Sequence, residues 1–272
     1  GDQVKILKPA QAGDHIRRAG EDVEPGQTVV QQGQIIGPGD IAMLVAQGHT
    51  NASVIKNPRV AIIPTGDELV EAGKPIGPGQ IANSNGIMLK TMCLELGMEP
   101  LLLPIVRDQQ EALSRAIVDA SKKSDLILTI GGVSVGDFDY VLSSIQENGA
   151  IDFWKVAIKP GKPLAFGHID QTPIIGLPGN PASAFVCFEL FARPALLKLA
   201  GRPSHRRIVV QAKLAKSVKQ NKTREQFLRA RLTQNGSHYC VETGSTQGSG
   251  QLSSMVNINA LAQIPSGHGT ID

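Results

Sequence analysis

Four short stretches of the sequence combine glycine, proline and charged side chains in a way that suits the binding of an anion. They are PTGDEL at residues 64–69, GGVSVGDFD at 131–139, KVAIKPGKP at 155–163 and GLPGNPAS at 176–183. Three of them directly follow apolar runs, RVAII, DLILTI and PII, which predict buried strands. Because ligands bind at the carboxyl ends of strands in open α/β sheets, we expect these stretches to form one site.

The second stretch places Gly131, Gly132 and Gly136 between a predicted strand and a predicted helix. Glycine lets the backbone approach a ligand closely, and the positive end of the following helix adds to the attraction for phosphate. A tight turn that needs positive φ explains the same glycines equally well when this stretch is taken alone. Neither GxGxxG nor GxxxxGK[ST] occurs, so dinucleotide-binding and P-loop folds lose support.

Three lysines, Lys155, Lys159 and Lys162, lie within eight residues, and prolines stiffen the segment between and after them. On an extended strand, Lys155 and Lys159 share a face. We interpret the lysines as a cradle for a polyphosphate or an oxyanion, since an ammonium about 4 Å from a charge gains roughly 4 kcal/mol at an effective dielectric near 20. A solvated strand edge is the competing interpretation.

Acidic side chains follow two of the predicted strands. Asp67 suits a helix N-cap and Asp137 suits a turn, so structure alone explains both. Glu68 and Asp139 have no such structural explanation, and carboxylates beside phosphates commonly hold Mg²⁺. We therefore rank Glu68 and Asp139 first as metal ligands or acid–base residues.

A serine hydrolase is the alternative enzyme, because residues 132–136 also fit G-x-S-x-G with Ser134 as the nucleophile. Only two clear parallel strands precede this stretch, which argues against the hydrolase fold. His168, the nearest downstream histidine, has no obvious acidic partner in the proper chain order. We expect Ser134 to donate a hydrogen bond to phosphate instead.

Composition narrows the class of protein. The chain has 272 residues, 41% hydrophobic and 19% charged, so it can bury a core. A net charge of +3 and an aromatic content of 4% argue against nucleic-acid binding. No apolar run approaches a membrane span, and cysteine and histidine spacing supports neither disulfides nor zinc. We expect a soluble, cytoplasmic protein with no membrane partner.

The elements that position these stretches fall into three regions. Residues 1–57 have dense Gly and Pro punctuation, which predicts small strands and one short helix over 40–46, without a core of its own. Residues 58–203 alternate apolar runs with amphipathic segments, which predicts a parallel α/β sheet. Residues 204–272 contain short alternating runs, RIVVQAKL, FLRARL, HYCVET and NALAQIP, which predict a small β unit.

Together, TGDEL, GGVSVGDFD, KPGKP and GLPGNPAS resemble, in this order and spacing, the molybdopterin molybdenumtransferase family. That family comprises the bacterial MoeA type and the C-terminal domain of gephyrin. GDHIRRAGEDVEPG, TREQFLRARL and SGQLSSM extend the resemblance along the chain. It implies an α/β fold: a central molybdopterin-binding domain flanked by a small, mostly β linker region and a C-terminal domain that resembles a β-barrel.

The resemblance implies an Mg²⁺-dependent transferase. Such an enzyme takes molybdate and adenylylated molybdopterin, inserts molybdenum into the dithiolene and releases AMP. Molybdopterin adenylyltransferase is then the upstream partner, and the family assembly is a homodimer. Family members carry a segment before GDHIRRAGEDV that this sequence does not show, so we expect an N-terminally shortened chain. The remaining alternative is a non-enzymatic scaffold, as among the gephyrin relatives.

The resemblance also implies roles for single residues. Glu68, Asp108 and Asp139 match acidic positions of the active site, and Asp22 matches another functional acidic position. Residues that match the substrate pocket and its shaped turn are Lys155, Lys159, Pro178 and Pro181. Residues that match an oxyanion site are Lys162, Ser183, Arg224 and Ser254. Motif residues that we further expect at the substrate are Thr65, Gly131, Gly132, Ser134, Gly136 and Asn180.

Overall fold

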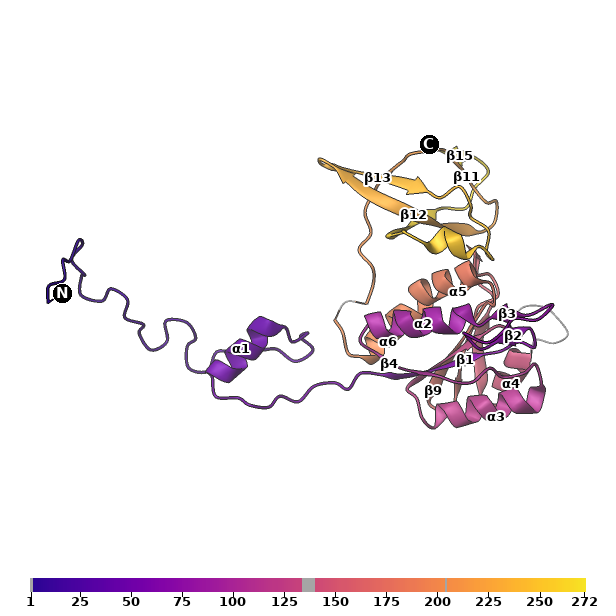
Figure 1. The fold of residues 1–272 in the computed structure, drawn as a ribbon, viewed down its shortest axis with the longest axis horizontal. Coiled ribbons are helices and arrows are strands. Elements are labelled where there is room, and N and C mark those ends of the chain that lie inside the picture. The colour runs from indigo at the N-terminus through magenta and orange to yellow at the C-terminus, as the bar shows by residue number, and fades with distance from the viewer. Residues whose placement is uncertain (1, 134–139, 204) are drawn as a thin grey trace. The chain divides into compact units, whose positions relative to one another are not determined.

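The fold is that of a computed structural model, which describes residues 2–133, 140–203 and 205–272 (Figure 1). The chain divides into two compact units, an N-terminal unit of residues 1–54 and a main unit of residues 55–272. No helix in the described ranges is both long enough and apolar enough to cross a bilayer.

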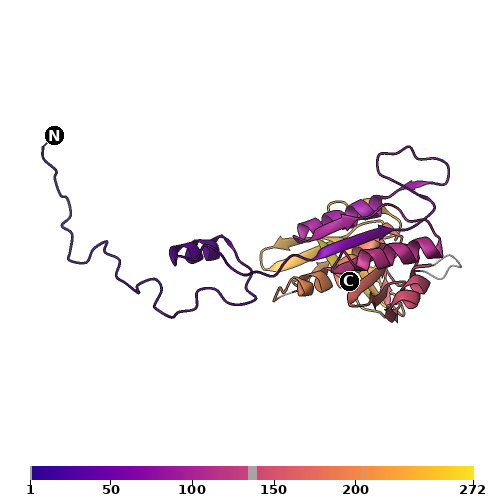
Figure 2. The same cartoon turned by 90° about the horizontal axis from the view of Figure 1, so that it is seen from below.

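The N-terminal unit contains one helix, α1 (Pro38–Ala46), coloured indigo in Figure 2. Proline starts this helix, and the Gly37 N–H donates a 2.8 Å hydrogen bond to the Asp40 carboxylate. Elsewhere the described residues 2–57 form no strand, and none of residues 2–54 is buried. The small strands predicted here are therefore wrong, because short apolar pieces with no neighbouring strand do not form a sheet.

The main unit is built around a six-stranded sheet with the order β4-β1-β5-β9-β8-β6. The strands are β1 (Arg59–Pro64), β4 (Glu99–Leu102), β5 (Leu126–Ile130), β6 (Ala150–Trp154), β8 (Ala165–Ile169) and β9 (Thr172–Leu177). Pairing is parallel from β4 to β9, as predicted, whereas β8 is antiparallel to both of its neighbours. β8 and β9 form a hairpin because the two residues between them are too few for a parallel crossover.

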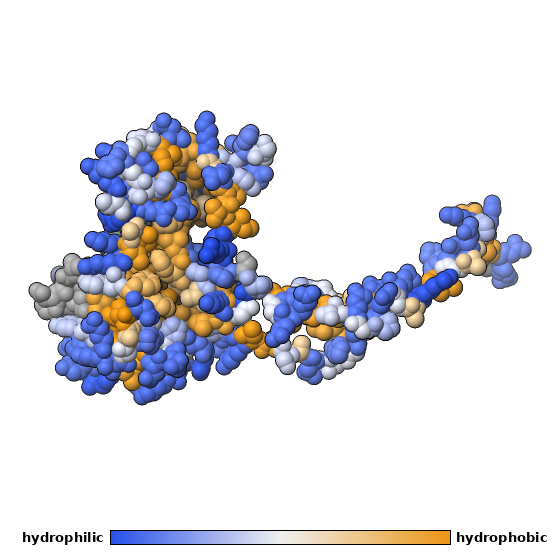
Figure 3. Space-filling model, turned by 180° about the vertical axis from the view of Figure 1, so that it is seen from behind, coloured by the Kyte–Doolittle hydropathy of each residue, from blue (hydrophilic) through white to orange (hydrophobic). Residues whose placement is uncertain are grey.

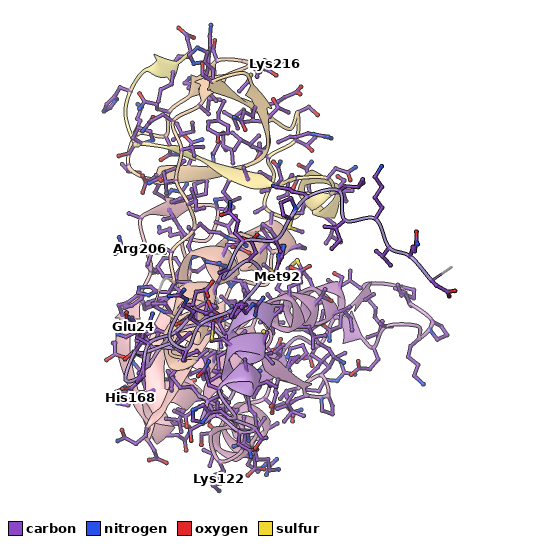
Figure 4. All side chains as sticks on the ribbon, turned by 90° about the vertical axis from the view of Figure 1, so that its left-hand side faces the viewer. Glu24, Met92, Lys122, His168, Arg206 and Lys216 are labelled. Atoms are coloured by element: carbon purple, nitrogen blue, oxygen red, sulfur yellow. The ribbon has the colours of Figure 1, made fainter. Side chains whose placement is uncertain are left out.

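Helices cover both faces of the sheet (Figure 1). α2 (Ser84–Glu95), α5 (Pro181–Cys187) and α6 (Arg193–Leu199) cover one face, and α3 (Gln110–Ser121) and α4 (Tyr140–Asn148) cover the other. A π-helical turn, η1 (Phe188–Ala192), joins α5 to α6. Side chains of β5 alternate between the two cores, since Leu126 and Leu128 pack with Met92 of α2 (Figure 4) and Ile127 packs with α3 and α4. Burial on both faces explains the uninterrupted apolar runs of the sequence.

The C-terminal part of the main unit is a curled sheet with the order β10-β13-β12-β14. Its strands are β10 (Lys213–Leu214), β12 (Glu225–Asn235), β13 (His238–Thr243) and β14 (Ala260–Ile264). β11 (Val218–Lys219) and β15 (Thr270–Ile271) pair with each other in a separate two-stranded sheet, and the 3-10 turn η2 (Leu252–Met255) precedes β14. Seen from behind, apolar residues gather in the middle of the main unit, and hydrophilic residues cover its ends (Figure 3). The predicted strand RIVVQAKL is formed only at Lys213–Leu214, since Ile208 and Val209 are exposed.

Candidate functional site

Chain segments that are far apart in sequence meet at one edge of the central sheet. β1, β5 and β9 are parallel, so the stretches that follow them leave the sheet at the same edge. β8 is antiparallel, so the stretch 155–163 before it lies at this edge too. Val106, beyond the end of β4, pairs with Thr65 and brings Asp108, two residues further on, to the same edge. The described residues of all four stretches predicted to form one site therefore share what we call the strand-end edge.

Three of the stretches touch through their backbones. The Thr65 N–H donates to the Ile130 carbonyl oxygen, and the Gly131 N–H donates to that of Leu177, both over 3.0 Å. Gly131 has a φ of +94°, and a Cβ there would lie 3.0 Å from the Thr65 carbonyl oxygen. A Cβ on Gly179 would lie 3.7 Å from the Gly131 Cα. The stretches pack so closely at Gly131 that a larger residue would strain both the turn and its neighbour.

Carboxylates gather beside the first stretch. Burial raises the pKa of the Asp108 carboxyl, and the negative charges of Asp67 and Glu68 raise it further. Arg107 Nη1 donates a 2.7 Å hydrogen bond to the Asp67 carbonyl oxygen and lies 3.8 Å from the Asp67 carboxylate. Asp67 and Glu68 therefore act on Asp108 through their negative charge, which favours a cation nearby.

Cationic side chains line a hollow of about 500 Å³ at the 155–163 stretch. Lys155 and Lys162 contribute from this stretch and Arg224 from the start of the C-terminal sheet. The hollow is completed by Val156, Ala157 and Thr223. β7 (Ile158–Lys159) pairs with the first residues of β12, and the Glu225 N–H donates to the Ala157 carbonyl oxygen over 3.0 Å. This pairing carries Arg224 to the two lysines, which makes the hollow suitable for an anion.

Lys159 does not line this hollow. It lies exposed in β7, where it pairs with Gln226 of β12. The strand face that we predicted Lys155 and Lys159 to share is wrong, because β6 ends at Trp154 and Lys155 has a φ of +70°. Side chains alternate between two faces only along a continuous strand, and the left-handed residue Lys155 interrupts the extended backbone between β6 and β7.

Sequence comparison identifies the family to which this chain belongs. A family model described as "Probable molybdopterin binding domain" matches residues 61–198. Models of the MoeA N-terminal region (domain I and II) and C-terminal region (domain IV) match residues 1–48 and 211–272. The chain belongs to the MoeA family.

Individual MoeA relatives match most of the chain. The molybdopterin molybdenumtransferase of Haemophilus influenzae is 37% identical over 219 residues, covering 79% of this chain and 54% of the relative. That of Staphylococcus aureus is 33% identical and covers 98% of this chain and 64% of the relative. The chain therefore spans less than two thirds of the length of these relatives. The crystal structure of a molybdopterin biosynthesis MoeA protein from Pyrococcus horikosii superposes with a TM-score of 0.83 at 33% identity, covering 100% of this chain and 67% of that chain.

The last stretch of the site connects to the C-terminal sheet. Pro181 starts α5, and Ser183 is buried within its first turn. The Asn180 side chain donates to the Ser249 hydroxyl over 3.2 Å, and the Ala182 N–H donates to the Ser249 carbonyl oxygen over 2.9 Å. Pro178 lies in the turn between β9 and this contact. Sequence reasoning did not find Ser249, whose backbone and side chain both hold the last stretch in place.

Sequence reasoning also missed Arg229. This side chain of β12 is completely buried. Its Nε donates to the Ser254 hydroxyl over 3.2 Å and its Nη2 to the Gly248 carbonyl oxygen over 3.1 Å. Within the described part of the chain, its Nη1 has no hydrogen-bond partner, and burial lowers the pKa of the guanidinium. The only sequence signal was an arginine within the buried run QFLRA.

Several predicted residues are not tested by this geometry. Ser134, Gly136 and Asp139 lie outside the described residues. Asp22 lies exposed in the N-terminal unit.

Gly132 has a φ of +62°, and a Cβ there would meet Val141 of α4 at 2.7 Å, so packing requires a glycine at this position.

His168, considered for the hydrolase alternative, does have an acidic neighbour. Its Nδ1 lies 3.6 Å from the Asp152 carboxylate, which corrects our expectation that it lacks one in the right chain order. However, His168 pairs with Ala150, the first residue of β6, and so belongs to the edge opposite the strand-end edge (Figure 4). The pair is therefore remote from the Gly131 stretch and does not support a hydrolase.

Proposed function

We propose that this chain acts in molybdenum cofactor biosynthesis as a molybdopterin molybdenumtransferase. In this reaction molybdenum from molybdate enters the dithiolene of adenylylated molybdopterin, and AMP is released. Family membership and the names of the curated relatives support the proposal. The structural observation that carries it is the hollow in which Lys155, Lys162 and Arg224 converge beside the strand-end edge.

The site separates positive from negative groups. The cationic hollow suits the phosphates of the substrate or molybdate, which is a tetrahedral dianion. Lysine offers a mobile point charge, whereas arginine offers a planar fork for two oxygens. The carboxylates of Asp67, Glu68 and Asp108 lie at or beside the 64–69 stretch, and they repel anions. A substrate with both a pyrophosphate and an uncharged pterin is thereby oriented as well as bound.

Arg229 supports a second anion contact. Its buried Nη1 is a donor without a partner in the described ranges, and its other nitrogens are fixed by Ser254 and Gly248. An oxyanion that reached Nη1 would satisfy this group without reorganising the side chain. We propose that Arg229 joins the oxyanion site inferred for Lys162, Ser183 and Arg224, with Ser254 as its support.

Glu68 and Asp139 are our proposed magnesium ligands. In the described ranges no three potential ligands lie close enough together to enclose a metal ion. Mg²⁺, however, is usually bound through one or two carboxylates together with waters and substrate phosphates. Asp67 and Glu68, whose charges raise the pKa of Asp108, could supply such carboxylates, because a bound cation would relieve their mutual repulsion. When bound, Mg²⁺ supplies charge neutralisation at the phosphates.

Further parts of this proposal concern the whole protein. We propose that it works as a cytoplasmic homodimer and receives its substrate from molybdopterin adenylyltransferase. Lys159, Thr65, Asn180, Pro178, Pro181 and the described glycines are proposed substrate contacts or shaping residues, and Ser134 and Gly136 are proposed on sequence alone. Asp22 is proposed as a functional acidic residue of the N-terminal unit.

The test is a molybdate-dependent assay of AMP release from adenylylated molybdopterin with and without Mg²⁺. We expect Glu68→Gln and Asp139→Asn to fold normally and to lose most AMP release. Glu99→Gln is the matched control, because Glu99 is exposed at the start of β4 and so at the opposite edge. Full AMP release by either site variant would refute the assignment. Labelling of Ser134 by a fluorophosphonate, with activity lost in Ser134→Ala, would favour the hydrolase.

A further inference from the structure

Trp154 contacts two of the four stretches at once. Its indole Nε1 donates a 3.0 Å hydrogen bond to the carbonyl oxygen of Val133, in the glycine-rich stretch. Above its ring, the ammonium nitrogen of Lys155 lies 3.7 Å from the ring centroid. Trp154 is the last residue of β6 and is partly exposed. A single side chain thus joins the glycine-rich stretch to one of the cations of the hollow.

The backbone at Lys155 strengthens this relationship. Lys155 has a φ of +70°, a region that non-glycine residues seldom occupy unless surrounding structure holds them there. Its N–H donates to the Leu164 carbonyl oxygen, and the next N–H, of Val156, donates to that of Lys162, both over 2.9 Å. The turn therefore fixes where the Lys155 side chain starts, and the Trp154 ring restricts where it ends.

Packing alone would not require this arrangement. Phe153, the preceding residue, makes an apolar contact, since its ring stacks on Phe166 with centroids 5.5 Å apart. Trp154 instead uses both of its polar properties, the ring quadrupole toward a cation and the N–H toward a carbonyl oxygen. This difference between two adjacent aromatic residues indicates a role for Trp154 beyond filling space.

On the basis of the proposed function, we propose that Trp154 is a positioning residue for anion binding. Its ring holds the Lys155 ammonium at the hollow before an anion arrives, and its N–H holds Val133, the residue after Gly131 and Gly132, beside Trp154. An ammonium has three N–H donors, so it can donate to an anion while it stays over the ring. The gain in affinity comes from the smaller loss of side-chain freedom when the anion binds.

The contact itself can be tested without a ligand, because Trp154 is the only tryptophan in the sequence. We expect Lys155→Met to change the intensity or wavelength of tryptophan emission. Lys123→Met, a substitution at an exposed lysine after α3, serves as the control and should leave the emission unchanged. Equal emission from Lys155→Met and the unsubstituted chain would overturn the inference.

Binding of AMP, measured by calorimetry, tests the role. We expect Trp154→Leu to weaken AMP binding about three- to fivefold, the size expected when one lysine side chain must be ordered on binding. In the Lys155→Met background the same substitution should cost clearly less, because only the loss of the Val133 hydrogen bond then remains. Phe153→Leu, the matched control, should bind AMP as the unsubstituted chain does. Trp154→Phe keeps a weaker ring and is expected to fall between Trp154→Leu and the unsubstituted chain.

The outcomes separate this inference from the proposed function. If the unsubstituted chain binds no AMP, the proposed function fails and this inference with it. If the chain binds AMP and Lys155→Met weakens that binding, an unchanged affinity in Trp154→Leu overturns this inference alone. An equal loss from Trp154→Leu in both backgrounds also overturns it, since that result means a purely structural role.

Discussion

The side-chain amide of Asn180 donates a hydrogen bond to the hydroxyl of Ser249 across 3.2 Å. Asn180 precedes α5 of the α/β region, and Ser249 precedes η2 of the C-terminal sheet. A second bond, from the Ala182 N–H to the Ser249 carbonyl oxygen, reinforces the contact. The two regions of the main unit are therefore fixed together at the place where we propose that the oxyanion binds.

Asn180→Ala should loosen this contact. One exposed hydrogen bond is lost while the backbone bond to Ser249 remains, so we expect a decrease of about 1 kcal/mol in the free energy of unfolding. Molybdate binding should weaken as well, because the oxyanion groups on the two regions are then less well aligned. Chemical denaturation and molybdate calorimetry measure the two effects, with Ser253→Ala, at an exposed position of η2, as the control. Unchanged molybdate affinity would mean that the contact serves stability only.

Arg229→Met should separate stability from binding. A buried charge with an unpartnered nitrogen is costly, so replacement by an apolar side chain of similar length should leave thermal stability equal or higher. Molybdate affinity should fall at least tenfold, since a charged hydrogen bond is worth about 1.5–3 kcal/mol. Arg231→Met changes an exposed arginine of the same strand and should alter neither property. A large loss of stability with intact molybdate binding would make Arg229 a structural residue.

Gly131→Ala should destabilise the close contact between the 64–69 and 131–139 stretches at Gly131 and Thr65. The substitution combines a positive φ with a contact at 3.0 Å to the Thr65 carbonyl oxygen, so we expect a loss of more than about 1 kcal/mol in stability. Gly73→Ala is the matched control, because Gly73 also has positive φ, +85°, but nothing within 4 Å of its added Cβ. Thermal unfolding of both variants isolates the cost of the close approach. Equal losses would show that backbone strain alone explains the glycine.

Asp108→Asn should raise stability in a pH-dependent manner. The folded-state pKa of this carboxyl is raised, so ionisation opposes folding once the pH exceeds the unfolded-state pKa of about 3.9. The substitution removes that cost, and we expect stabilisation at pH 7 that disappears at pH 3. Glu68→Gln should reduce the difference between the two pH values, because the Glu68 charge contributes to the shift. Stabilisation of equal size at both pH values would contradict this account.

The sequence predicted the α/β region well because its signals are local. The uninterrupted apolar runs of β1 and β5 follow from burial on both faces, and α2 ends just before Gly97, which has a φ of +76°. In the β unit after Arg206, the predicted strands FLRARL, HYCVET and NALAQIP are confirmed as β12, β13 and β14, whereas RIVVQAKL is formed only at its end. Its apolar alternation resembles a strand, yet Ile208 and Val209 remain exposed, since a strand forms only where another strand supplies hydrogen-bond partners.

The sequence alone determined the motif stretches, their attachment to strand ends and the family to which they belong, because residue types and spacing are enough for these conclusions. Only the tertiary structure decided which charges meet. It brought Arg224 to Lys155 and Lys162, left Lys159 outside their hollow and revealed Arg229 and Ser249. The physical reason is that these relationships depend on strand pairing between distant segments, which no local pattern encodes.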